Sequence, residues 1–125
     1  MPFPASGAVW LLLQAVPLVD VGFTSSSLRD PFQAADATDA CIVNSDFLRA
    51  NLAGSRFTRA CLRGSQFPSC IVNQAVFIGA DLSAADFSGT ERESLEGADL
   101  RGALADSETK WPKGFDPAKS GVRFS

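Results

Sequence analysis

The chain has 125 residues, 46% of them hydrophobic, and a formal net charge of −3 at pH 7. That is enough for one domain with a small core, and the composition is not that of a disordered protein. With no histidine and no CxxC spacing among its three cysteines, the chain cannot be a zinc finger or use Ser-His-Asp or Cys-His chemistry.

The first predicted element is an apolar segment, residues 1–29. Its most hydrophobic part, SGAVWLLLQAVPLV, is shorter than the ~20 residues of a membrane-spanning helix and contains Gln14 and Pro17. A secretory signal would have a Lys or Arg before this stretch, and this sequence has none there. It is therefore a cap on the domain that follows, a docking segment for a membrane or larger complex, or a targeting remnant. The candidate docking or cap residues are Val9, Trp10, Leu11, Leu12, Leu13, Val16 and Leu18.

A large apolar residue, here called a centre, recurs at every fifth position of the next segment. The residue two positions before each centre is always alanine, serine or cysteine. The ten consecutive centres are Ile42, Phe47, Leu52, Phe57, Leu62, Phe67, Val72, Phe77, Leu82 and Phe87.

A spacing of five fits neither regular element. On a helix each step would turn the centres by about 140°, and on a strand successive centres would face opposite sides. A chain that turns a corner every five residues lets all centres point to one axis. Units of this kind stack into a solenoid, in which each buries its apolar site against its neighbours.

The repeat is interrupted at TERESLEGADLRGALAD. If residues 90–92 are an insertion, forming an outward bulge at one corner, the register resumes with centres at Leu95, Leu100 and Ala105. Upstream, Phe32 and Ala37 are also in register. The predicted repeat domain is therefore 30–107, with a regular part at 40–89 and a resumed part at 93–107.

The last predicted element is a C-terminal cap, residues 108–125, which would cover the apolar end of the solenoid. Asp116 and Pro117 are placed as the N-cap and first residue of a short helix that ends at Gly121. Its apolar residues are Trp111, Phe115, Val122 and Phe124.

The units ANLAG, ADLSA, ADFSG and ADLRG resemble the A(D/N)LXX unit of the pentapeptide-repeat family, and the TKWPKGFDP tail resembles that of cyanobacterial and plastid members. The resemblance implies an all-β fold, a right-handed quadrilateral parallel β-helix with four units per coil. About three coils are expected. Phe47, Phe67 and Phe87 would then stack on one wall, opposite Phe57 and Phe77.

Two further features lie on the outside of such a coil. Cys41 and Cys61, twenty residues apart, would project from one wall at a separation that a disulfide tolerates. They form either a disulfide or two surface thiols, whereas Cys70 occupies an inward site. One wall is a candidate protein contact, with scattered surface residues as the alternative. Its residues are Arg56, Arg59, Ile71, Val76, Ile78 and Arg101.

An enzyme is disfavoured by the sequence. Glu91, Glu93 and Glu96 cluster at the insertion, but a filled solenoid offers them no cleft, and a solvated acidic loop is the ordinary explanation. No cofactor or metal motif is present. Residues 40–89 hold four arginines against three aspartates, too little acid for a mimic of DNA that protects gyrase and no basic stripe for nucleic acid.

The family resemblance implies a non-catalytic, rigid scaffold that binds protein partners. We expect an accessory subunit docked on a photosynthetic membrane complex in the thylakoid lumen, with any membrane contact made only through the apolar N-terminal segment. The alternative is a stand-alone bacterial protein of the periplasm or cytoplasm.

Overall fold

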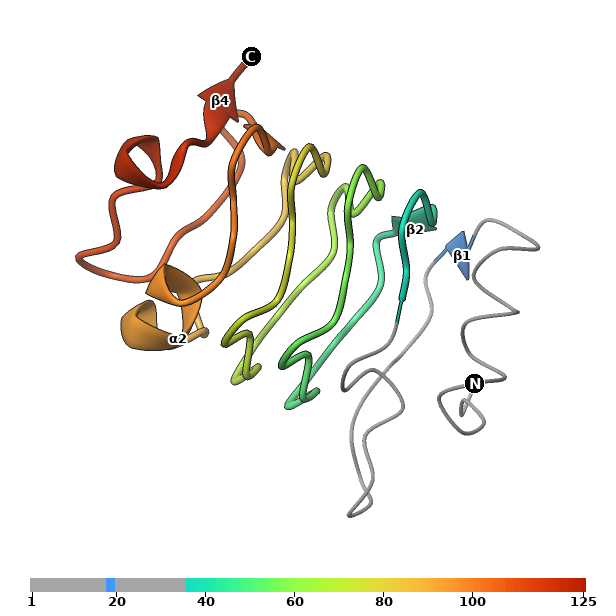
Figure 1. Cartoon of the computed structure of the whole chain (residues 1–125), viewed down its shortest axis with the longest axis horizontal. Helices are drawn as coiled ribbons and strands as arrows, with labels where there is room; N and C mark the ends of the chain where they lie inside the picture. Colours follow the sequence, from blue (N-terminus) through green and yellow to red (C-terminus); the bar gives the residue numbers. More distant parts are fainter. Residues whose placement is uncertain (1–17, 20–35) are drawn as a thin grey trace.

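The structure, a computed structural model, describes residues 18–19 and 36–125. The repeat forms a right-handed quadrilateral parallel β-helix whose coils stack side by side along the long axis of the molecule (Figure 1). The regular elements are short, because most of each coil consists of single bridges and turns. They are β1 (Leu18–Val19), β2 (Ile42–Val43), α2 (Arg92–Glu96), β3 (Leu104–Ala105), the 3-10 helix η1 (Ala118–Ser120) and β4 (Arg123–Phe124).

Parallel backbone pairing joins each coil to the next at an offset of twenty residues. Cys41 pairs with Cys61, and Cys61 with Asp81. The backbone N–H of Ile42 donates to the carbonyl of Cys61 at 2.7 Å. The series is closed at both ends by two-residue strands, since β1 pairs with β2 and β4 with β3, both parallel.

The corners explain the spacing of five. The residue two positions after each centre from 37 to 82 has a positive φ, as the third residue of a type II turn does. The N–H of the following small residue then returns to the centre's carbonyl, as in the 3.0 Å bond from Ala60 N to Phe57 O. These corner residues, with φ between 54° and 70°, are Asp39, Asn44, Arg49, Gly54, Arg59, Gly64, Ser69, Gln74, Gly79 and Ala84.

Phenylalanine rings fill the interior in two columns. Phe67 stacks between Phe47 and Phe87, with centroid distances of 4.9 and 4.4 Å. Phe57 and Phe77 stack at 5.4 Å on the opposite side. The two columns meet edge to face, at 6.4 Å between Phe47 and Phe57, the arrangement that the ring quadrupoles favour. The predicted assignment of phenylalanines to two opposite walls is confirmed.

The small inward residues complete the core without leaving polar atoms unpaired. The Ser55 hydroxyl donates to the carbonyl of Leu52 at 2.5 Å, and the Thr90 hydroxyl to that of Phe67 at 2.7 Å. In the described part of the chain, every buried side-chain nitrogen and oxygen has a hydrogen-bond partner. The small polar residues of the interior thus stabilise the coil through these hydrogen bonds.

The interruption of the repeat is a helical turn. Val76 pairs with Asp99 and Asp81 with Leu104, so the offset grows from 20 to 23 residues. The extra residues are taken up by α2, which buries Ser94 and Leu95. The sequence predicted an outward bulge at residues 90–92 and a centre at Leu95, but the five-residue pattern does not indicate that residues 92–96 form a helical turn.

The C-terminal tail lies over the end of the phenylalanine column. Trp111 stacks on Phe87 at 5.6 Å and nearly parallel, and Phe115 follows at 5.5 Å. The predicted short helix differs in detail, since it is the 3-10 helix η1 with Pro117 as its N-cap. A segment this short closes more readily with 3-10 than with α hydrogen bonds. It ends at Gly121, as predicted, where φ is 85°.

The corner at Ala84 allows a test of the turn geometry. Ala84 has a φ of 58°, which disfavours any residue with a Cβ. We predict that Ala84→Gly raises the free energy of unfolding by about 0.5–1 kcal/mol, since relief of strain outweighs the greater freedom of the unfolded chain. The neighbouring Ala85→Gly is the control. Because Ala85 is buried, this substitution should lower the free energy of unfolding. Urea unfolding of both variants checks this, and equal destabilisation would contradict it.

The tail's stacking contact generates a second prediction. Trp111→Ala removes the ring that covers Phe87, and we expect a loss of about 2–3 kcal/mol, below the range for a fully buried tryptophan because Trp111 is only partly buried. Trp111→Phe keeps an aromatic ring and should lose less than half as much. Thermal unfolding of the full chain gives both values, and indistinguishable Tm values for the two variants would argue against stacking as the cause.

Candidate functional site

The repeat brings most of the predicted contact residues to one wall. Arg56, Val76 and Asp99 are successive backbone pairing partners, one per coil. Beside them, the carbonyl of Ile78 accepts a hydrogen bond from the backbone of Arg59, and that of Arg101 from Gly79. Ile71 lies around the corner, in the column that begins with Asn51. We call the six predicted residues (Arg56, Arg59, Ile71, Val76, Ile78 and Arg101) the contact wall.

Exposure differs among the apolar residues of the contact wall. Ile71 is 47% exposed, whereas Val76 and Ile78 are half-buried. The other exposed large apolar residue in the described part of the chain is Phe124, at 54%. The sequence assigned Phe124 to the cap, but it lies in β4, the outermost strand, where no further coil covers it.

Two of the three arginines on the contact wall are held by neighbouring carboxylates. Arg59 bonds Asp39 through two nitrogens at 2.9 and 3.0 Å, and Arg101 bonds Asp99 at 2.7 Å. These hydrogen bonds lower the pKa of Asp39 and of Asp99 below their usual range. Arg56 has no ion pair within the described residues. Asp36 is its backbone pairing partner, and the pKa of Asp36 is lowered by hydrogen bonds from Thr38 and also by the charge of Arg56. Arg56 therefore has an acidic neighbour, but it is held less closely than Arg59 and Arg101 are.

The outward aspartates and asparagines mostly serve the corners. In each case the Oδ1 atom accepts the backbone N–H two residues further on, an Asx turn. The distance is 3.0 Å at Asp36, Asn51 and Asp81, and 2.9 Å at Asp46 and Asp86. In the units that have Asp or Asn at this position, the side chain thus stabilises the corner of the coil.

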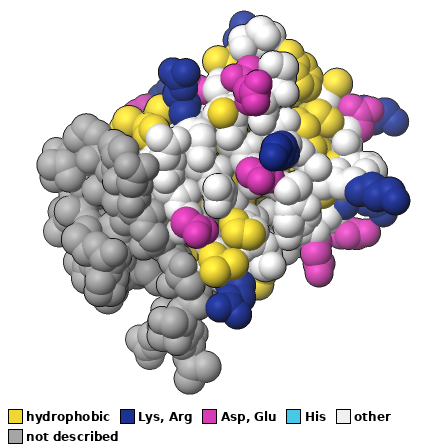
Figure 2. Space-filling model, turned by 180° about the vertical axis from the view of Figure 1, so that it is seen from behind, with side chains coloured by type: hydrophobic (Ala, Val, Ile, Leu, Met, Phe, Trp, Pro, Cys, Tyr) yellow, Lys and Arg dark blue, Asp and Glu magenta, His cyan; other side chains and the backbone are white. Residues whose placement is uncertain are grey.

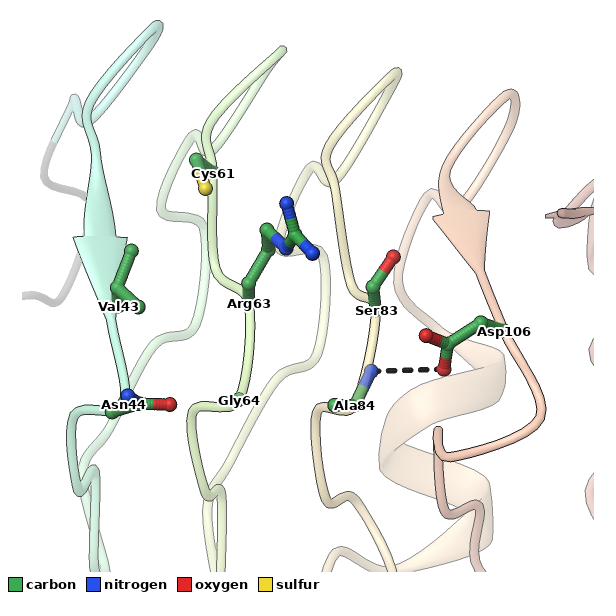
Figure 3. A pocket seen from close by; sticks show the side chains of 8 residues that line it. All are labelled: Val43, Asn44, Cys61, Arg63, Gly64, Ser83, Ala84 and Asp106. Atoms are coloured by element: carbon green, nitrogen blue, oxygen red, sulfur yellow. Dashed lines mark hydrogen bonds between the residues drawn. The ribbon is translucent and has the colours of Figure 1, made fainter.

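A shallow groove of about 470 Å³ crosses four coils beside the corner at Gly64 (Figure 3). Asp106 closes it, because its Oδ1 accepts the N–H of Ala84 at 3.1 Å in place of a backbone carbonyl. Sequence analysis missed Asp106, although the Asp-Ser-Glu after Ala105 is an Asx-turn signal. The groove is lined by Val43, Asn44, Cys61, Arg63, Gly64, Ser83, Ala84 and Asp106.

The two outward cysteines lie directly beside each other. Cys41 and Cys61 are parallel pairing partners, and both are half-buried free thiols. Burial, and secondarily the neighbouring Cys61, raises the pKa of the Cys41 thiol. The disulfide stays a prediction. Cys70 is buried, and its sulfur contacts the carbonyl of Phe47 at 2.8 Å.

The remaining candidates do not assemble into a site. Glu93 and Glu96 lie on α2 beside Arg92, at 3.1 and 3.9 Å. Within residues 18–19 and 36–125, no cluster of three His, Cys, Asp or Glu could hold a metal ion, and no helix is long and apolar enough to cross a membrane. Figure 2 shows the face of the molecule opposite to that in Figure 1. Acidic and basic side chains are interspersed on it, without a continuous patch of either sign.

The N-terminal docking candidates fall mainly outside the described residues. Leu18 opens β1, whose backbone pairs with β2. The other candidates, Val9, Trp10, Leu11, Leu12, Leu13 and Val16, lie in the part that the structure does not describe.

Comparison with family models matches residues 32–67 and 66–91 to pentapeptide repeats, in eight copies. The crystal structure of alr5209, a pentapeptide repeat protein from Nostoc PCC 7120, superposes with a TM-score of 0.75 over 100% of this chain and 99% of its own, at 21% identity. That similarity establishes the fold alone. A search of curated proteins finds no significant match.

Looser similarities also involve pentapeptide repeat proteins. HetL of Nostoc sp. PCC 7120, involved in heterocyst differentiation regulation, gives a TM-score of 0.35 at 17% identity, over 84% of this chain and 41% of HetL. AT2G44920 from the Arabidopsis thaliana thylakoid lumen gives 0.22 at 21% identity, over 75% and 56%. At these scores neither similarity bears on the function of this chain.

The hydrogen bonds to Asp106 predict a pH dependence. Donation from the backbone of Ala84, and then of Glu108, lowers the pKa of Asp106, so its contribution to stability is present above about pH 4, the unfolded value, and is lost as pH falls through the folded pKa. Asp106→Asn keeps the hydrogen-bond acceptor but not the charge. Between about pH 6 and pH 3, we therefore expect its Tm to fall less than that of the wild type.

Asp106→Ala separates the acceptor from the charge in the same experiment. Because it removes both, its Tm should be lower than that of Asp106→Asn at every pH. Parallel Tm curves for wild type and Asp106→Asn would show that the charge is not involved.

Proposed function

Because the chain belongs to the pentapeptide-repeat family, we propose that it is a non-catalytic scaffold that binds a protein partner through the contact wall. Proteins of this family are generally structural or interaction modules. The strands β1 and β4 at the two ends of the β-helix, together with the backbone hydrogen bonds between coils, make the coil rigid, so side chains on the wall are held in place before binding. A preorganised surface loses little conformational entropy on association.

The observation that carries the proposal is the exposure of Ile71 beside two half-buried aliphatic residues. Ile71, Val76 and Ile78 follow one another around a single corner, whereas the interior centres of the same coil are fully buried. Arginine is enriched at protein interfaces, and Arg56 is the arginine of this wall that forms no ion pair within the described residues. Acidic and basic side chains are mixed on the surface shown in Figure 2, and such a surface fits a protein better than a nucleic acid as partner.

The finer part of the proposal concerns the partner. We propose a subunit of a photosynthetic membrane complex in the thylakoid lumen, with the apolar N-terminal segment 1–29 as a second attachment point. The motivation is the apolar composition of that segment and the resemblance of the tail to those of cyanobacterial and plastid proteins. The alternative remains a stand-alone bacterial protein of the periplasm or cytoplasm.

Affinity capture with the tagged full chain tests both parts. From solubilised thylakoid membranes we expect the wild type to capture a subunit of a photosynthetic complex, and Ile78→Asp to lose it by at least about tenfold, since a charge would be desolvated in an apolar contact. Quantitative mass spectrometry of the captured proteins is the measurement.

Leu48→Asp is the matched control. Leu48 is half-buried and occupies the same position of its unit as Ile78, but on the opposite wall. It should retain the partner. Equal capture by Ile78→Asp and wild type would refute the contact wall, while capture only from bacterial soluble extracts would refute the thylakoid placement.

A further inference from the structure

The pair Cys41 and Cys61 has the geometry of a cross-link between coils. Cys61 donates its N–H to Ala40 at 2.8 Å and accepts from Ile42 at 2.7 Å, so Cys41 lies directly opposite it. Parallel strands place such partners about 4.8 Å apart, within the Cα range that disulfides span. Both thiols are free and half-buried, whereas that of Cys70 is buried.

The surroundings of the two thiols differ. Cys61 lines the groove together with Arg63, two residues further along the same coil, whereas Cys41 is not among the lining residues (Figure 3). The Arg63 side chain is 63% exposed, and its Nε lies 3.8 Å from a carboxylate oxygen of Asp81, a loose ion pair. The Asp106 carboxylate also lines the groove, but two coils away from Cys61. A small anionic molecule at the Cys61 end of the groove therefore meets the thiol and the Arg63 guanidinium.

We propose that Cys61 and Cys41 form a thiol–disulfide exchange site for low-molecular-weight disulfides that carry carboxylates. The Cys61 thiolate attacks one sulfur of the small disulfide, and the other sulfur leaves as a thiolate. The Cys41 thiolate then attacks the Cys61 sulfur and expels the second small thiolate. Two protein thiols are oxidised to one disulfide, the small disulfide is reduced to two thiols, and the two protons released by the cysteines are taken up by the leaving thiolates.

The order of the steps follows from the structure. Cys61 reacts first because it lines the groove, and Cys41 is positioned to resolve the mixed disulfide. The product joins the coil that carries β2 to the next coil. Because β1 pairs with β2, oxidation stabilises the end of the β-helix to which β1 attaches.

Exposure of the folded full chain to oxidised glutathione tests the proposal. Mass spectrometry of the wild type should show a peptide pair linked through Cys41 and Cys61, without retained glutathione. Cys41→Ser should keep one glutathionyl group on Cys61, and Cys61→Ser should leave Cys41 as a thiol. Cys70→Ser, which alters the buried cysteine, should behave like the wild type. The cross-linked protein should unfold roughly 5–10 °C higher than the reduced form, because the bond closes a loop of about twenty residues.

Arg63→Gln separates recognition from thiol reactivity. It should slow the reaction with oxidised glutathione several-fold but leave the rate with neutral hydroxyethyl disulfide unchanged. An equal effect on both reagents would refute recognition by Arg63. Wild type that stops at a glutathionyl adduct, or that reacts only after unfolding, would refute the exchange site itself. None of these outcomes depends on the contact wall.

Discussion

The left-handed backbone conformation at every fifth residue is the constraint on which the rest of this structure depends. Ten successive corners have it, from Asp39 to Ala84. Each turns the chain so that the next centre again points inward, and four such turns return the backbone to a position one coil along, where its N–H and C=O groups pair. Seven of these corners have a residue other than glycine. The backbone hydrogen bonds between coils and the packed core therefore hold these residues in a left-handed conformation that residues with a Cβ otherwise disfavour.

The same constraint decides where function can reside. The interior is filled by stacked phenylalanines and small residues, and its hydroxyl groups are bonded to backbone carbonyls. Outside, the aspartates and asparagine that precede some of the centres accept corner N–H groups. The outward positions that the corners do not use are therefore the ones available for recognition, and they include Ile71, Arg56 and the Cys41 and Cys61 pair.

Much of the fold could be predicted, because a periodic pattern repeats its information. The phenylalanine columns follow from counting in fives, and Leu95, Leu100 and Ala105 are buried at the positions that a shift of three residues indicates. The candidate site was harder to predict. Counting brings Val76 and Ile78 to one wall, but the ion pairs of Arg59 and Arg101 depend on rotamers and neighbours. Asp106 was missed because its role, replacing a carbonyl for Ala84, exists only between coils.

The sequence by itself determined the unit, its inward and outward positions and the twenty-residue coil, because side-chain size at fixed spacing is enough to specify which residues a turning chain can bury. Only the tertiary structure decided how the irregular parts end the pattern. It placed α2 where three residues had to be absorbed, stacked Trp111 on Phe87, and left Phe124 exposed on the last strand. Those outcomes depend on what the neighbouring coil offers at each point, and no local pattern of residues contains that information.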